Sequence, residues 1–180
     1  MDIREPWRSD SVEQMARKLF TNLHQTILSH ESGSLAGAVE SVHDMRVTVR
    51  RLRVALSNFA VCVPKEERKR LQLRLENLAD ALGGVRDMDV MIAAMKTSPT
   101  PLSVQEKSAV SALIGRLRAR RRSRLRALMK YLGGEEYVKF KRESPSDWIK
   151  MNGTYRSKEP DKSLSGRSQT SQEEEHGQGA

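Results

Sequence analysis

Residues 42–59 read VHDMRVTVRRLRVALSNF, and the spacing of their apolar side chains predicts the amphipathic α-helix that decides the fold. On a helix that turns by about 100° per residue, these side chains fall on one stripe. The members of the stripe are Met45, Val49, Leu52, Leu56 and Phe59. Because such a stripe faces a hydrophobic core, the helix is expected to pack within a bundle.

Beside the apolar stripe, the same helix carries basic side chains at one-turn spacing. This basic arc, about 80° wide, consists of His43, Arg46, Arg50 and Arg53, and Arg51 lies off to the other side. Asp44 is the only acid in the stretch, and like charges one turn apart destabilise a helix by about 0.2–0.5 kcal/mol per pair. The arc is therefore either an ordinary solvated basic face or a surface that binds an anion.

The formal charge of the chain, +9 over 180 residues, is unevenly distributed. Residues 1–142 hold 27 Lys and Arg against 16 Asp and Glu, a net charge of +11, whereas residues 143–180 hold 5 against 7, a net charge of −2. The cationic part should attract polyanions with an affinity that falls as salt rises. The scarcity of aromatic residues argues against a platform that stacks single-stranded bases.

The single cysteine, Cys62, excludes an internal disulfide framework and fits a reducing compartment. It lies at the end of an apolar helix face, so we expect a buried, unreactive thiol. The first ten residues show no apolar segment of a secretory signal, and no apolar run reaches the roughly 18 residues that suggest a membrane span. We therefore expect a cytoplasmic protein without a membrane partner.

The periodicity predicts an all-α fold, an antiparallel bundle of four long helices. The first helix is capped by Ser9 or Ser11 and runs to about His30, with an apolar stripe of Val12, Met15, Leu19, Leu23 and Ile27. Residues 31–37 are expected to form a loop. Ser41 resembles an N-cap with Asp44 three residues on, which would place His43 in the first turn of the second helix, where the macrodipole favours an anion.

A third helix is predicted from about Lys65, with Leu71, Leu75, Leu78 and Leu82 on one stripe. Gly83 and Gly84 either break this helix or are needed where a neighbouring backbone comes close, and the periodicity favours a continuous helix. Asp89 then lies on the core side of the helix. Burying its carboxylate without a partner would cost on the order of several kcal/mol, so Asp89 needs a basic partner.

A fourth helix is predicted over residues 103–132, after a turn at 97–101. Its apolar stripe consists of Val110, Leu113, Leu117, Leu125, Leu128 and Leu132. Arg121 and Arg124 point inward with these leucines, and Arg118, Arg122 and Arg126 point away. Arg121 is the partner that Asp89 needs, while Arg124 and the adjacent Arg120 can line a groove shared with the basic arc.

The remainder of the chain is divided between the bundle and a tail. A short fifth helix is expected near residue 137, so the bundle is assigned to residues 10–142. Residues 143–180 are assigned to a polar C-terminal tail, disordered over 157–180 because Ser, Gln, Glu and Gly dominate there.

The sequence shows no arrangement typical of a catalyst. It has no Gly-rich phosphate loop and no motif around Cys62 that would indicate a nucleophile. The four histidines form no metal-binding pair, and His24 and His30 are interpreted as surface or boundary residues of the first helix. Ion pairing is favoured over Mg²⁺ binding at Asp87 and Asp89. We expect no enzymatic activity, no cofactor and no metal.

Two motifs, VHDMRVTVRRLRVALSNF (42–59) and LGGVRDMDVM (82–91), together resemble the conserved histidine α-helical domain, CHAD. The stretch 116–132, followed by Tyr137, is similar to the next helix of that family. The resemblance implies an all-helical fold that binds inorganic polyphosphate in a channel lined by basic residues, often at polyphosphate granules. Carried over to this sequence, the binding residues are His43, Arg46, Arg50, Arg51 and Arg53, with Arg120, Arg121 and Arg124 opposite them.

The chain departs from the family in one respect, because full members carry two four-helix units and only one is visible here. This departure leaves three possibilities. Two copies of the chain pair to complete the channel, a separate chain supplies the second CHAD half, or the product is truncated and binds weakly. Two other functions fit the charge: binding of nucleic acid, for which no helix-turn-helix or RNA-binding motif is found, and binding of an acidic protein partner.

Overall fold

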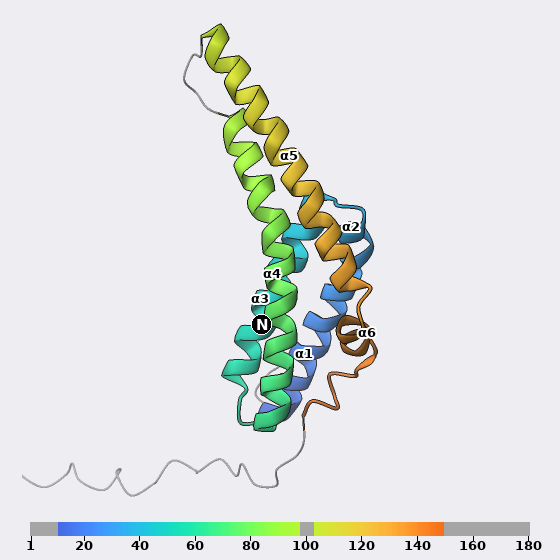
Figure 1. Ribbon diagram of the computed structural model, residues 1–180. Helices are drawn as coiled ribbons and strands as arrows, with labels where there is room; N and C mark the ends of the chain where they lie inside the picture. Colours follow the sequence, from blue (N-terminus) through green and yellow to red (C-terminus); the bar gives the residue numbers. More distant parts are fainter. Residues whose placement is uncertain (1–10, 98–102, 150–180) are drawn as a thin grey trace, which may run out of the picture.

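The computed structural model describes residues 11–97 and 103–149, and every regular element within these ranges is an α-helix (Figure 1). The helices are α1 (Val12–Ser29), α2 (Glu31–Leu35), α3 (Val39–Asn58), α4 (Lys65–Lys96), α5 (Val104–Leu132) and α6 (Glu135–Arg142). The predicted all-α bundle of four long helices is confirmed, with α1, α3, α4 and α5 as the long members. The short helix expected near residue 137 is α6, and α2 occupies most of the predicted loop at 31–37.

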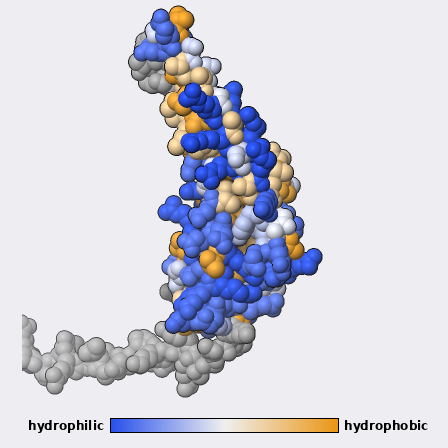
Figure 2. All heavy atoms as spheres, in the orientation of Figure 1, coloured by the Kyte–Doolittle hydropathy of each residue, from blue (hydrophilic) through white to orange (hydrophobic). Residues whose placement is uncertain are grey.

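Helix α4 lies between α3 and α5, and α3 lies between α1 and α4. At one end α4 and α5 run on past the other helices as a two-helix arm (Figure 1). Several apolar side chains of this arm are exposed, among them Val90, Met95 and Val104, and orange patches mark the arm in Figure 2. Leu113, a member of the predicted stripe of α5, is 40% exposed, because in the arm α5 packs against no described helix other than α4.

The core-facing side of α1 differs from the prediction. Ala16, Phe20, Leu23 and Ile27 are buried, whereas Val12, Met15 and Leu19 are 38–41% exposed. Phe20 takes the inward position because it packs edge-on against Phe59, with ring centroids 6.1 Å apart, and lies tilted against the ring of Trp148, at 6.2 Å. The aromatic contacts therefore turn the helix by about one residue from the phase that the aliphatic side chains predict.

The N-terminus of α3 also differs from the prediction. The helix begins at Val39 with Ala38 as its N-cap and no side-chain cap, and the amide of Val42 donates to the carbonyl of Ala38 (3.0 Å). The chain turns at Gly37, whose φ of +72° suits glycine, so the helix starts two residues before Ser41. The cap predicted at Ser41 is wrong, and His43 lies in the second turn. The cap predicted for α1 is confirmed at Ser11, which forms a capping box with Gln14.

The folded part extends beyond residue 142, the predicted end of the bundle. Trp148 and Ile149 are 1% and 5% exposed, and the Trp148 ring stacks on Phe140 with centroids 5.9 Å apart. His24 is buried beneath them and its Nε2 donates to the carbonyl of Phe140 (3.0 Å), so its interpretation as a surface or boundary residue is wrong. These aromatic contacts hold residues 143–149 against α1.

Some predictions fall on residues 1–10, 98–102 and 150–180, which lie outside the described residues. They include the turn at 97–101, apart from Thr97, and the disordered segment at 157–180. Within the described ranges, no helix has the length and apolar character needed to cross a membrane.

Candidate functional site

The apolar stripe of α3 fixes the direction of its basic side chains. Met45, Val49 and Leu52 are fully buried, and each such side chain contributes about 1.5–3 kcal/mol through burial. Because the helix is anchored on this side, Arg46 and Arg50 project beside the buried stripe and are exposed. The packing that stabilises the bundle thus also presents guanidinium groups to the outside.

Two grooves run along the basic surface of α3. One, of about 650 Å³, lies between α1 and α3 and is lined by Arg46, Arg50 and Arg51, with Leu19 and Val54 among its apolar residues. The other, of about 480 Å³, lies between α3 and α4 and is lined by Arg50, Arg53, Ser57, Gln72 and Glu76. Arg50 lies on the ridge that the two grooves share, so it can serve a ligand in either.

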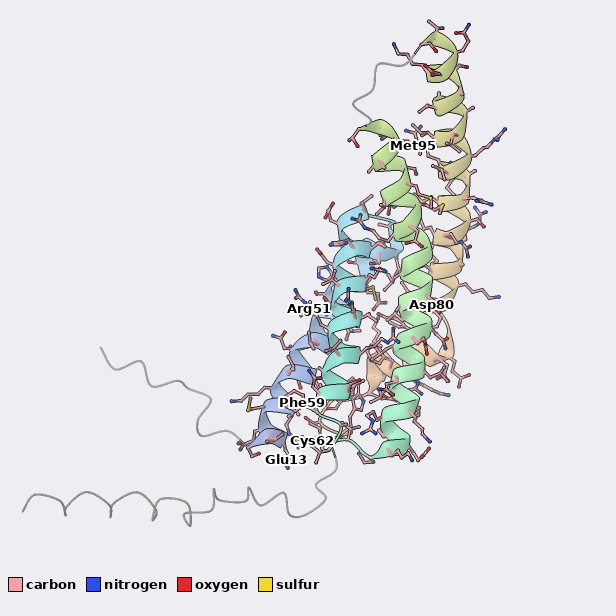
Figure 3. The ribbon with its side chains drawn as sticks, turned by 90° about the vertical axis from the view of Figure 1, so that its left-hand side faces the viewer. Glu13, Arg51, Phe59, Cys62, Asp80 and Met95 are labelled. Carbon is pink, nitrogen blue, oxygen red and sulfur yellow. The ribbon has the colours of Figure 1, made fainter. Side chains whose placement is uncertain are left out.

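The basic residues of α3 differ in whether they pair with other residues of the protein. Nη2 of Arg53 lies 3.7 Å from Oε1 of Glu76, an exposed pair of little energetic value. Among the described residues, Arg46, Arg50 and Arg51 make no ion pair or side-chain hydrogen bond (Arg51 is labelled in Figure 3). Three guanidinium groups on α3 therefore keep their donors available for an anion.

His43 is half-buried, whereas Arg46 and Arg50 of the basic arc are exposed. Its Nδ1 is buried and has no hydrogen-bond partner among the described residues. A buried polar atom left without a partner costs about 1–3 kcal/mol. The structure thus places His43 next to the arginines in sequence and on the same helix, but with its Nδ1 turned away from solvent.

Arginines from α3 and α5 reach α4 at its glycine pair. A methyl group on Gly83 would lie 3.8 Å from Nε of Arg46, and one on Gly84 would lie 3.1 Å from Cδ of Arg124. Helix α4 is continuous through both glycines, as the periodicity predicts, and the neighbours that approach are side chains rather than backbone. Arg120, one turn before Arg124 and exposed, lies on the same side of α5.

Arg121 is hydrogen-bonded to other residues inside the protein. Its Nε and Nη2 donate to the two carboxylate oxygens of Asp89, at 2.5 and 3.3 Å, and Nη2 also donates to the carbonyl of Gly37 (2.8 Å). The Asp89 side chain is 6% exposed and that of Arg121 is 17% exposed. The predicted pairing of Asp89 with Arg121 is confirmed, and this use of Arg121 removes it from the set that we assign to a ligand.

A second arginine held by ion pairs within the protein was not predicted. Arg74, 7% exposed, donates from Nε to Glu136 (2.8 Å) and from Nη1 to Glu143 (2.6 Å). The hydrogen bond from Arg74 holds the pKa of the Glu136 carboxyl below its usual value. Arg74 lies at helical spacing from the buried Leu71 and Leu78, and this position on the apolar stripe of α4 is the sequence signal that could have revealed it.

The described residues offer little for metal or thiol chemistry. No group of three or more His, Cys, Asp or Glu side chains within them is placed to hold a metal ion. Cys62 is 4% exposed, and burial, with a smaller effect of the Glu13 charge, raises the pKa of its thiol. A raised pKa disfavours the thiolate that would be needed for nucleophilic reactivity.

Comparison with protein families gives a match to the CHAD domain over residues 18–172. This match covers most of the chain and includes the basic helix α3, the glycine pair of α4 and the arginine-rich segment of α5. No curated protein and no solved structure matches the chain.

Proposed function

Because this chain belongs to the CHAD domain family, we propose that it binds inorganic polyphosphate through the basic face of α3 and catalyses no reaction. The family is associated with polyphosphate binding in general. The observation that carries the proposal is the set Arg46, Arg50 and Arg51, three guanidinium groups that line one groove beside α3 and that make no ion pair or side-chain hydrogen bond with a described residue.

The spacing of these groups suits a linear polyanion. Successive turns of an α-helix are about 5.4 Å apart, so the ladder of Arg46 and Arg50 presents repeated donors along one direction, and Arg51 lines the same groove. Each guanidinium can fork onto two phosphate oxygens, and a polymer with a charge on every unit can satisfy several of them at once. A compact anion would satisfy only part of the ladder.

The arginines contribute unequally in this proposal. Arg46, Arg50 and Arg51 form the principal set, and Arg53 contributes less because Glu76 partly neutralises it. The exposed Arg120 and Arg124 extend the positive surface onto α5. His43 lies beside these arginines on the second turn of α3. Its buried Nδ1 could contact a ligand only if the side chain moved.

The described residues form one four-helix unit, whereas the family resemblance implies two in a complete channel. We propose that a second copy of the chain, or a separate chain, supplies the other wall, and that the protein acts at polyphosphate granules. Colocalisation of a tagged chain with stained granules would support this site of action, and uniform distribution would contradict it.

A charge-matched pair of variants tests the proposal. Arg46→Ala with Arg50→Ala removes two charges from α3, and Arg118→Ala with Arg122→Ala removes two exposed charges, also one turn apart, from the side of α5 turned well away from Arg124. The α3 variant should lose retention on long-chain polyphosphate while the α5 variant keeps it. Equal losses would show that general charge, rather than this site, governs binding.

Duplex DNA is the competitor that separates this function from nucleic-acid binding. Unlabelled polyphosphate should displace labelled polyphosphate at moderate salt far better than duplex DNA at equal phosphate concentration. Better displacement by DNA would favour the nucleic-acid alternative, and failure to bind either polymer, with retention of an acidic protein, would favour a protein partner.

A further inference from the structure

The outer face of α4, between the arginines of α3 and those of α5, carries acids on either side of its glycine pair. Asp80 and Asp87 lie three to four residues from Gly83 and Gly84, so all four share one face of the helix (Asp80 is labelled in Figure 3). Both carboxylates are exposed, and neither forms an ion pair with another described residue. On this face of α4, the helical turn that holds Gly83 and Gly84 is therefore a gap without side chains between two carboxylates.

Across this gap, Arg46 and Arg124 lie on opposite sides of α4. Both arginine side chains pass close to the glycines. Nε of Arg46 lies 3.8 Å from the position of a methyl group added to Gly83, and Cδ of Arg124 lies 3.1 Å from that of one added to Gly84. With no Cβ at either position, the two guanidinium stems can lie against the helix, and an anion can approach its backbone closely.

We propose that a polyphosphate chain crosses α4 at Gly83 and Gly84 and contacts Arg46 and Arg124 together. The two glycines are then positioning residues, and Asp80 and Asp87 confine the crossing by repelling phosphate one turn to either side. This inference rests on the proposed function and adds to it a path for the ligand from α3 to α5.

The variant Gly84→Ala isolates the positioning role. A methyl group 3.1 Å from Cδ of Arg124 is closer than the roughly 3.5–4.0 Å at which carbon atoms prefer to lie, so the flexible arginine must move off the helix. Alanine also favours the helix over glycine. The variant should therefore melt at or above the temperature of the wild type, yet bind polyphosphate about tenfold more weakly, the loss expected for one charge-assisted contact.

Gly115→Ala is the matched control, because nothing lies within 4 Å of a methyl group at Gly115 on α5. This variant should gain helix stability in the same way and leave the dissociation constant for polyphosphate unchanged. If Gly84 acts through Arg124, adding Gly84→Ala to Arg124→Ala should weaken binding no further, since the contact is already lost.

The experiment is a titration of the full chain with long-chain polyphosphate of one length at fixed salt, with thermal melts of each variant. Weaker binding by Gly84→Ala alone, absent in Gly115→Ala and in the Arg124→Ala background, supports the crossing. Equal affinities of Gly84→Ala, Gly115→Ala and the wild type overturn it while leaving the proposed function intact. Failure of the wild type to bind polyphosphate overturns the proposed function and the crossing together.

Discussion

Removing the carboxylate of Asp89 should destabilise the bundle far more than removing a neighbouring acid. The variant Asp89→Ala leaves Arg121 without its bidentate partner in a position where the arginine side chain is 17% exposed. Breaking a fully buried ion pair from one side costs about 3–5 kcal/mol. Because Arg121 keeps some solvent and its bond to the carbonyl of Gly37, we expect about 3 kcal/mol, at the lower end of that range.

Asp87→Ala is the matched control for this prediction. Asp87 lies on the same helix, carries the same charge and is exposed, so its removal should change the free energy of unfolding by less than about 0.5 kcal/mol. For a chain of this size, 1 kcal/mol shifts Tm by about 2–4 °C. Asp89→Ala should therefore melt roughly 6–12 °C below the wild type, whereas Asp87→Ala should melt near it.

Circular dichroism during thermal and urea unfolding measures both variants directly. The midpoint in urea should fall for Asp89→Ala with little change in the slope, because the native fold is retained. Replacing both partners, with Asp89→Ala and Arg121→Met, should recover much of the loss since no charge is left unpaired. Equal stabilities of Asp89→Ala and Asp87→Ala would refute the assignment of Arg121 as an internal structural arginine.

Three further predictions concern pH, thiol reactivity and assembly. Arg74 lowers the pKa of Glu136 below its usual value of 4.5. The ionised Glu136 carboxylate therefore stabilises the fold fully above pH 4.5, and this stabilisation is lost as pH falls through the lowered pKa. Glu136→Gln should reduce the dependence of Tm on acid pH, and an unchanged profile of Tm against pH would contradict this. Cys62, with its raised pKa and 4% exposure, should react with a thiol reagent slowly in the native protein and rapidly in urea, and equal rates would show that it is accessible. Light scattering should show larger particles when polyphosphate is added, because one polymer bridges two half-channels, and a strict monomer in both conditions would argue against completion of the channel by a second copy.

The fold was largely predictable because the leucine stripes of α4 and α5 and the apolar stripe of α3 each have one dominant phase. Helix α1 was less predictable, since apolar residues occupy two adjacent phases and Phe20, rather than Leu19, faces the core. The position of Trp148 could not be derived from periodicity either, because it follows the last helix and packs through aromatic contacts with Phe140. Contacts between side chains, rather than helical phase, decide such cases.

The site was predictable where helical phase alone fixes a side chain. The phase of α4 and α5 led to the pairing of Asp89 with Arg121, which the structure contains. The network of Arg74 was missed because its partners, Glu136 and Glu143, lie 62 and 69 residues along the chain. No local pattern reports a pairing at that separation.

The direct test of polyphosphate binding by the arginine face is a polyphosphate titration repeated over a series of salt concentrations. If Arg46, Arg50, Arg51 and Arg124 each neutralise one phosphate, the logarithm of the association constant should fall against the logarithm of salt with a slope of about −3. Arg46→Ala with Arg50→Ala should reduce that slope by about half. A wild-type slope near zero, or the same slope in this variant as in the wild type, would contradict polyphosphate binding by the basic face of α3.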